Sequence, residues 1–242
     1  MSATVYSLKN VVKQRIIENA GFRLCIPSLE IQAGENIAIV GHSGCGKSTL
    51  LDMLALILCP DTTDQFEISP VDARSDNIDI LWQQKNQDRL AQVRRQHIGY
   101  VLQSGGLLPY LTVRENIELP RKLLQLADDD SISSISRVLG IHRQLDKLPG
   151  LLSAGERQRA AFARALSHRP SILLADEPTA ALDPITARKI MAVVMELIKG
   201  LKITLITASH DWAHVYKMEL RILDQEAGPI EQGRIYQSTF RD

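Results

Sequence analysis

The sequence predicts an α/β fold built on a mainly parallel sheet, and three observations support that prediction. A glycine-rich turn, Gly41–Ser48, joins the apolar run Asn36–Val40 to the helix-forming run Thr49–Leu56. The C-terminal part of the chain alternates short apolar runs with longer helix-forming stretches, which implies right-handed crossovers between parallel strands. Residues 1–35 instead alternate short apolar and polar stretches, a pattern typical of antiparallel strands.

Several apolar runs of strand length precede the glycine-rich turn. Apolar stretches of strand length lie at Val5–Leu8, Phe22–Ile26 and Leu29–Ile31, and Ala33–Glu35 is a turn into the next strand. The polar region that follows the glycine-rich turn contains one more strand-like run, Gln65–Ile68. We therefore expect an antiparallel β part at this end of the chain.

The remaining elements follow the same logic of alternating runs. Strands are expected at Ile98–Val101, Ser171–Ala175, Thr204–Thr207 and Arg221–Leu223. Helices are expected at Asn86–Gln96, at several places between residues 109 and 149 that include Ser131–Leu139 with Ser131 as its cap, and at Ala154–His168, Ile185–Lys199 and Asp211–Met218.

Composition and charge fit one large domain and exclude several classes of protein. The 242 residues are 45% apolar and 23% charged, as in ordinary globular proteins. The 28 basic and 28 acidic residues cancel, so we expect no nucleic-acid partner. Cys25, Cys45 and Cys59 have neither disulfide nor metal-ligand spacing, which favours a reducing compartment. The sequence shows neither a secretory signal pattern nor an apolar run of the roughly 20 residues that a membrane span needs. We therefore expect no membrane-spanning helix.

The glycine-rich turn has the complete pattern G-x-x-x-x-G-K-[ST] of a phosphate-binding loop. Its glycines let backbone N–H groups close around phosphate oxygens, and the helix start adds partial positive charge. Lys47 would reach the β- and γ-phosphates, and the Ser48 hydroxyl would bind Mg²⁺. A structural glycine turn is the competing explanation, but it does not require the flanking strand and helix. The predicted ATP-binding residues here are Gly41, His42, Ser43, Gly44, Cys45, Gly46, Lys47, Ser48 and Thr49.

Two carboxylates end the apolar strand near residue 175. Ligands bind at the carboxyl ends of parallel strands, so we expect Asp176 and Glu177 to face the phosphate loop. Asp176 suits a Mg²⁺ ligand shell, and Glu177 is placed to orient the water that attacks the γ-phosphate. The alternative is a solvated acidic pair at a strand end, which the complete phosphate loop disfavours.

Other candidate residues are ambiguous when each is taken alone. His210 follows a core strand and Gln103 follows another, and both are compatible with ordinary structural roles. Ser153 and Gly155 begin an alanine-rich helix, which makes a second helix-start anion site. One phosphate loop already serves one nucleotide, so this second site needs another explanation.

With these motifs together, the chain resembles the nucleotide-binding subunit of ATP-binding-cassette (ABC) transporters over nearly its whole length. The motifs occur in the family's order: phosphate loop Gly41–Ser48, Gln-loop residue Gln103, signature Leu152–Glu156, Walker B strand Ile172–Glu177, D-loop Ala180–Asp183 and switch residue His210. The resemblance implies a P-loop NTPase (RecA-like) core with an N-terminal antiparallel β subdomain and an inserted α-helical subdomain. Residues 1–242 would form a single ABC ATPase domain, with the core at about 1–103 and 169–242 and the helical subdomain at 104–168.

The resemblance also implies how the site works. Two copies would pair head to tail around two ATP molecules, with the phosphate loop of one copy facing Ser153 and Gly155 of the other. Gln103 would contact Mg²⁺ and the attacking water, and would sense the membrane partner. His210 would hold the γ-phosphate, and Asp183 would lie at the nucleotide.

Residues 103–117 and the run Glu156–Arg159 resemble the lipoprotein-releasing, macrolide-exporting and cell-division group of these ATPases. That group works with a separate integral membrane subunit, which implies a cytoplasmic protein held at the inner face of the cell membrane. Leu107, Leu108 and Tyr110 either belong to the core or line a groove for that subunit, and we favour the groove. The alternative function is that of a soluble ABC-type ATPase in protein or iron–sulfur cluster assembly.

The chain departs from the family pattern at several positions. The signature reads Ser-Ala-Gly-Glu, and Ala154 is expected to restrict φ where the backbone nears a phosphate. The aromatic residue that stacks on adenine has no obvious counterpart: Arg15 or Ile16 occupies its position, and Arg15 could stack as a cation, while Phe22 is a less favoured substitute. The segment Asp61–Gln87 also departs from the usual sequence of the antiparallel subdomain.

Overall fold

The computed structural model describes residues 3–17, 20–71, 73–127, 129–210, 220–230 and 235–241. The chain folds as two compact units, one formed by residues 1–92 and 208–242 and the other by residues 93–207. The helix predicted at Asp211–Met218 lies outside the described residues. Within the described ranges, no helix combines the length and the apolar character that crossing a membrane requires.

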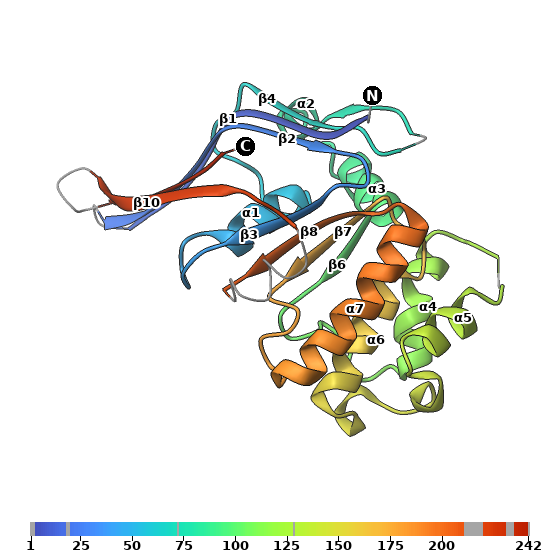
Figure 1. The fold of residues 1–242 in the computed structure, drawn as a ribbon. Helices are drawn as coiled ribbons and strands as arrows, with labels where there is room; N and C mark the ends of the chain where they lie inside the picture. The colour runs from blue at the N-terminus through green and yellow to red at the C-terminus, as the bar shows by residue number, and fades with distance from the viewer. Residues whose placement is uncertain are drawn as a thin grey trace. The chain divides into compact units, whose positions relative to one another are not determined.

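The first unit contains a six-stranded sheet with the order β10-β11-β2-β1-β4-β5. Its strands are β1 (Thr4–Ile17), β2 (Ala20–Gln32), β4 (Gln65–Ile68), β5 (Asp76–Asn77), β10 (Asp224–Ile230) and β11 (Ile235–Arg241). β11 runs parallel to β2, while β1 pairs antiparallel with both β2 and β4 (Figure 1). The predicted antiparallel arrangement of the amino-terminal strands is confirmed.

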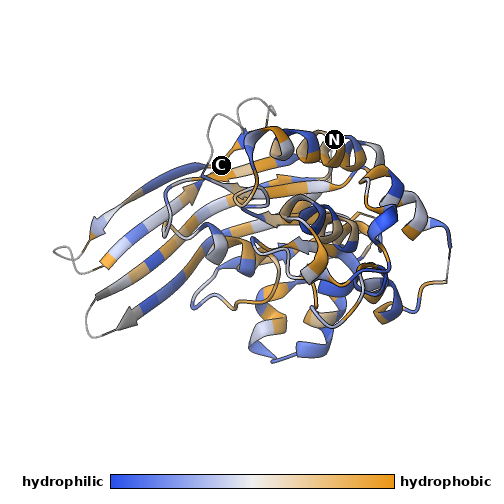
Figure 2. Cartoon of the chain, turned by 90° about the horizontal axis from the view of Figure 1, so that it is seen from below, coloured by the Kyte–Doolittle hydropathy of each residue, from blue (hydrophilic) through white to orange (hydrophobic). Residues whose placement is uncertain are grey.

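The long strands β1 and β2 are more continuous than the apolar runs predicted. The runs Phe22–Ile26 and Leu29–Ile31 belong to one strand, because Ser28 stays paired with Lys9 and the chain remains extended through Pro27. Opposite Pro27, which has no N–H to donate, Asn10 adopts a φ of 50°. Figure 2 shows polar and apolar segments alternating along these strands, as expected when one face packs against a core.

The first unit also carries the glycine-rich turn between β3 (Asn36–Val40) and α1 (Lys47–Leu54). β3 pairs in parallel with β9 (Arg221–Ile222), and its residues 37–40 are fully buried. Tyr6 of β1 is fully buried as well, and its hydroxyl donates to the Leu54 carbonyl at 2.7 Å. This bond ties the end of α1 to the antiparallel sheet.

The segment between residues 61 and 87, whose sequence departs from the family pattern, forms β4, β5 and the short helix α2 (Ile78–Gln83). Helix α3 (Gln87–His97) follows it. The sequence predicted only β4 and α3 in this region. Asp76 accepts two hydrogen bonds from the Arg89 guanidinium, at 2.9 and 2.8 Å, which fixes β5 against the start of α3. Such a bidentate pair forms between residues that no local pattern connects.

The second unit contains the parallel strands β6 (Ile98–Val101), β7 (Ile172–Asp176) and β8 (Thr204–Ser209), in this spatial order. β6 and β7 are paired in register from Ile98 and Ile172 to Val101 and Ala175, so both strands end at the same edge. Their side chains are almost wholly buried, which explains the uninterrupted apolar runs.

The second unit also contains helices, which lie close together in Figure 1. They are α4 (Val113–Leu123), α5 (Ser131–Val138), α6 (Ala154–Leu166) and α7 (Pro184–Leu201), with the short 3₁₀ turns η1 (His142–Gln144) and η2 (Pro149–Leu151). Ser131 is the first helical residue of α5 rather than its cap, and its amide donates to the Asp129 carboxylate at 2.9 Å.

Candidate functional site

In the phosphate loop of the first unit, the side chain of Lys47 is buried and bonded to the backbone of the loop. Lys47 is the first residue of α1 and only 4% exposed, and its Nζ donates to the carbonyls of Gly41 at 2.8 Å and His42 at 3.0 Å. The ammonium group therefore lies along the loop, beside the amides at the start of α1. Ser48 is exposed at the next position of the helix. This arrangement concentrates positive charge and N–H donors where an anion would bind.

Two glycines of the loop are required by close neighbours. Gly46 caps α1 with a φ of 97°, and a Cβ there would lie 2.6 Å from Cζ of Phe22 and 2.8 Å from Cδ1 of Leu24. A Cβ at Gly41 would lie 2.7 Å from Sγ of Cys45. The loop is therefore packed directly against the side chains of β2, and larger residues at these two positions would displace it.

The packing of Phe22 bears on the aromatic residue for which the sequence offered no clear counterpart. Phe22 is paired with Arg15 on β1 and with Tyr236 on β11, so the three side chains form one cross-strand row. Arg15 is exposed and Tyr236 is 43% exposed. The row thus brings two aromatic rings and a guanidinium to one part of the sheet, with Phe22 nearest the phosphate loop.

In the second unit the structure brings Gln103 and Glu177 together. Gln103 follows β6 and Glu177 follows β7, and Nε2 of Gln103 donates to Oε2 of Glu177 at 3.4 Å. Glu177 has a φ of 43°, a conformation that costs a non-glycine residue on the order of 1–3 kcal/mol. Asp176 is the half-buried last residue of β7. Strain of this kind persists where the surrounding structure fixes a side chain for a task.

Asp183 has a well-defined structural role in the second unit. It is the N-cap of α7, where its Oδ1 accepts from the amides of Ile185 at 3.1 Å and Thr186 at 3.0 Å. Hydrogen bonds from the side chain and backbone of Thr186 lower the pKa of the Asp183 carboxyl. The carboxylate therefore remains ionised and holds the start of α7 in place.

The signature sequence forms a capping box at the start of α6. The Ser153 hydroxyl accepts from the amide of Glu156 at 3.3 Å, and the Glu156 carboxylate accepts from the Ser153 amide at 2.8 Å and its hydroxyl at 2.7 Å. These bonds from Ser153 lower the pKa of Glu156. A glutamate three residues after the cap is the known partner in such a box. The S-x-x-E spacing is therefore a local sequence signal for this box, although the box was not among the predicted features.

The other two signature residues pack as the helix requires. A Cβ at Gly155 would lie 3.1 Å from Cγ2 of Thr186, so this glycine allows α6 and α7 to approach closely. Ala154 is the first residue of α6 and is not among the residues with positive φ. The restriction of φ by Ala154 therefore causes no strain in this conformation, because a helical backbone suits any L-residue.

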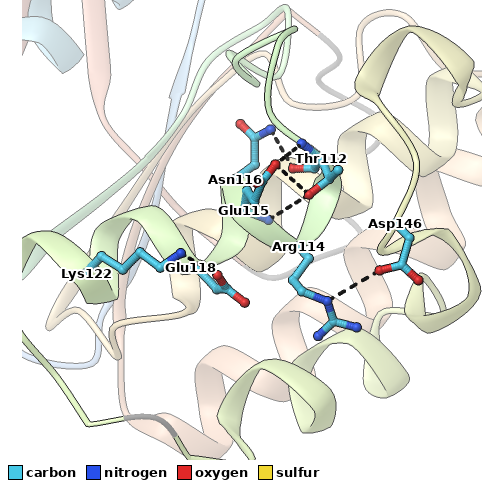
Figure 3. Close-up of polar contacts among 7 residues, drawn as sticks. All are labelled: Thr112, Arg114, Glu115, Asn116, Glu118, Lys122 and Asp146. Carbon is cyan, nitrogen blue, oxygen red and sulfur yellow. Dashed lines mark hydrogen bonds and ion pairs between the residues drawn. The ribbon is translucent and has the colours of Figure 1, made fainter.

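The segment after Gln103 is held by two residues that the sequence analysis missed. Asn116 of α4 is fully buried, and its side chain bonds the Leu108 amide at 2.7 Å and the carbonyls of Leu108, Leu111 and Thr112 at 3.1, 3.1 and 2.9 Å. Arg164 of α6 donates to the Gly106 carbonyl. Figure 3 shows Asn116 beside the capping box that Thr112 and Glu115 form at the start of α4.

These anchors leave an apolar surface on the same segment. Tyr110 is 73% exposed, which excludes it from the core, whereas Leu107 and Leu108 are half-buried. His210 is exposed directly after β8 and is the last described residue before the gap at 211–219.

Comparison with known proteins accounts for this set of motifs. The family model described as "ABC transporter" matches residues 25–180. The lipoprotein-releasing system ATP-binding protein LolD 1 of Rhodospirillum rubrum is 36% identical over 205 residues, which cover 84% of this chain and 86% of that protein. The dimeric structure of MJ0796, a bacterial ABC transporter cassette, is 32% identical with a TM-score of 0.74 and covers 87% and 90% of the two chains. A post-hydrolysis dimer of MJ0796 with ADP and phosphate is 31% identical with a TM-score of 0.72, over 86% and 89%.

Proposed function

Because the chain belongs to the ABC transporter ATP-binding family, we propose that it hydrolyses ATP as a head-to-tail dimer to drive a separate subunit embedded in the membrane. The observation that carries this proposal is the contact of Gln103 with the strained Glu177 at the ends of two neighbouring parallel strands. An amide and a carboxylate so arranged can orient one water molecule between them for attack on a phosphoryl group.

Lys47 and the start of α1 bind the phosphates of ATP in this proposal. The Lys47 ammonium, which lies against the carbonyls of Gly41 and His42, neutralises charge on the β- and γ-phosphates. Backbone amides of residues 44–49 donate to the same oxygens, and the dipole of α1 adds to the attraction. His210 holds the γ-phosphate from its position after β8.

The metal of the proposed site is Mg²⁺, and the available donors suit it. Ser48, Gln103 and Asp176 offer a hydroxyl, an amide carbonyl and a carboxylate, which are hard oxygen ligands. When bound, Mg²⁺ neutralises charge on the β- and γ-phosphates. Glu177 orients the attacking water, and Gln103 holds both that water and the carboxylate in position.

The second copy of the chain completes the site. Ser153 and Gly155 at the start of α6 close over the ATP held by the phosphate loop of the partner, and Asp183 lies near it. The dimeric structures of MJ0796, one of them with ADP and phosphate, support this arrangement. It explains why one chain has two helix-start anion sites.

The membrane subunit contacts the helical subdomain at residues 104–168. The exposed Tyr110 and half-buried Leu107 and Leu108 receive it, since Asn116 and Arg164 hold the backbone of this segment firmly beneath them. The protein then lies on the cytoplasmic face of the membrane through its partner. One relative belongs to a lipoprotein-releasing system and another to a macrolide exporter, which supports lipoprotein release or export as the activity this chain would drive. Mechanical work across the membrane is the third activity in this proposal.

The decisive experiment is an affinity pull-down from detergent-solubilised membranes with ATP, using Glu177→Gln as bait and Lys47→Ala as matched control. We expect a stoichiometric polytopic membrane protein with Glu177→Gln, together with a second copy of the untagged chain. Recovery of soluble proteins alone by an ATP-bound, dimeric bait would contradict the membrane role and favour an assembly ATPase.

A further inference from the structure

The loop that carries Gln103 is shaped by two glycines and lies against α6. Gly105 and Gly106 have φ values of 80° and 64°, and the Gly105 amide donates to the Leu102 carbonyl at 2.8 Å. A Cβ at Gly105 would lie 3.5 Å from Cβ of Ala161, which is 2% exposed on α6. The loop therefore follows the surface of this helix rather than extending into solvent.

Arg164 makes the polar contact between this loop and the helix. It lies in the last turn of α6, where its Nη1 donates to the Gly106 carbonyl and burial lowers its pKa. The C-terminal end of the helix is further held by Arg121 of α4, whose Nη1 donates to the Ser167 carbonyl at 3.1 Å. A half-buried guanidinium fixes the position of a carbonyl more firmly than apolar packing alone, because breaking the bond leaves a charge without its partner.

The two ends of α6 thus serve two different groups. Ser153 is the N-cap of α6, and Arg164 lies in its last turn, eleven positions later, at a rise that corresponds to about 16 Å. The Ser153 end belongs to the ATP site of the partner copy in the proposed dimer. The Arg164 end holds the loop of Gln103, which contacts Glu177 of its own site.

We infer that Arg164 is a positioning residue that couples the two ATP sites of the dimer through α6. When the start of α6 closes on the partner's nucleotide, the helix moves as a rigid rod and carries the Gly106 carbonyl with it. Gln103 is three residues away, so its amide shifts relative to Glu177. The inference rests on the proposed dimer, and it adds a route by which occupancy of one site adjusts the water-orienting pair of the other.

A purely structural role for Arg164 makes a different prediction. In that case its loss lowers the stability of the second unit and reduces all activities together. The coupling role predicts that ATP binding to the monomer is preserved, because Arg164 and the phosphate loop belong to different units, while the steps that need both copies are impaired.

The test uses the full chain and the variants Arg164→Met, Arg164→Lys and Arg169→Met. Arg169 is a matched control in the same unit, since it is exposed and its Nη2 donates to the half-buried Ser131 hydroxyl at 3.5 Å. In the Glu177→Gln background, the affinity for the fluorescent probe trinitrophenyl-ATP and the ATP-dependent dimer dissociation constant are measured side by side. In the wild-type background, kcat, KM and the Hill coefficient of hydrolysis are measured.

We expect Arg164→Met to weaken dimerisation and lower kcat about tenfold, with a Hill coefficient nearer one and an unchanged affinity for the probe. Arg164→Lys retains a donor and should recover part of both losses, and Arg169→Met should match wild type. Unchanged dimerisation and cooperativity in Arg164→Met, or losses that follow thermal stability alone, overturn the coupling role. A wild-type chain that binds ATP but neither dimerises nor hydrolyses it overturns the proposed function itself, and with it the inference.

Discussion

Gln103 and Glu177, 74 positions apart in sequence, meet through a 3.4 Å hydrogen bond at the ends of adjacent parallel strands. The strand register determines this meeting, because Val101 and Ala175 are paired two residues before each of them. The carboxylate is thereby directed by the backbone of β7 and by the amide of Gln103 together. We therefore expect a change at Glu177 to affect hydrolysis more than folding.

We expect Glu177→Gln to bind ATP normally, to accumulate as a dimer and to lose turnover by a factor of about 10² or more. The amide keeps the size of the carboxylate but cannot accept a proton from the attacking water. Steady-state phosphate release and size-exclusion chromatography with ATP measure the two effects. Glu196→Gln, an exposed substitution on α7, is the control that should behave as wild type. Normal hydrolysis by Glu177→Gln would remove that residue from the catalytic role.

Lys47→Ala should lose ATP affinity by about 100-fold, because the substitution removes the ammonium group beside the α1 amides. Isothermal titration with ATP measures the loss. Lys199→Ala removes an exposed lysine from the last turn of α7 and should leave affinity unchanged. An unaltered affinity in Lys47→Ala would show that the loop does not bind the phosphates.

Phe22→Ala should raise the KM for ATP about tenfold, since stacking of a base on an aromatic ring contributes on the order of 1–3 kcal/mol. Phe22 packs against Gly46 of the phosphate loop, so a base attached to bound phosphates can reach its ring. Phe22→Tyr keeps the ring and should keep the KM. If Phe22→Ala hydrolyses ATP with the wild-type KM, the base lies elsewhere on the sheet.

Alkylation of Cys45 should inhibit hydrolysis slowly, and ATP should protect. Cys45 is 3% exposed within the phosphate loop, so the reagent reacts only when the loop opens. Burial raises the pKa of both Cys25 and Cys59, which lowers their reactivity. Cys45→Ala should resist N-ethylmaleimide while the other two thiols still label by mass spectrometry. Equal inhibition of Cys45→Ala would assign the effect to a different cysteine.

The second unit should lose stability in mild acid because of His168. Burial lowers the pKa of this 9% exposed imidazole to about 4, below the value near 6.5 of an unfolded chain. The unfolded state therefore binds the proton first. Stability is complete above pH 6.5 and falls as the pH drops toward 4, by up to about 3 kcal/mol. Urea unfolding between these pH values measures the slope.

His168→Leu should flatten that slope, while His142→Gln, which changes an exposed histidine, should not. Arg121 and His97 add positive charge near His168 and reinforce the effect. An unchanged pH dependence in His168→Leu would assign the acid sensitivity to other groups.

The parts of the site that the sequence predicted are those that depend on local spacing. The phosphate loop, the acidic end of β7 and the cap Ser153 are each contained in fewer than ten consecutive residues, and their flanking runs determine strand or helix. The capping box of Glu156 was equally local and could have been found from the S-x-x-E spacing.

The parts that escaped depend on contacts between distant segments. Arg164 bonds a carbonyl 58 positions away, and any residue at Gly106 would present that carbonyl, so no side-chain pattern marks the pair. Phe22 was a candidate, but its packing against Gly46 of the phosphate loop joins segments distant in sequence, and Tyr236 lies beside it through the parallel register of β11. The pairing of β11 with β2 cannot be read from hydrophobic periodicity, because each strand alone is compatible with several pairings.

The capping box at the start of α6 bears on how two copies would close in the proposed dimer. The Glu156 carboxylate already accepts from the amide and the hydroxyl of Ser153 at this helix start. In the proposed dimer, a γ-phosphate bound by the partner copy would compete with that carboxylate for Ser153, so closure would exchange one anion for another. The lifetime of the closed dimer then depends on the difference between two competitors, and Glu156→Gln, which replaces the charged competitor by a neutral one, should lengthen it.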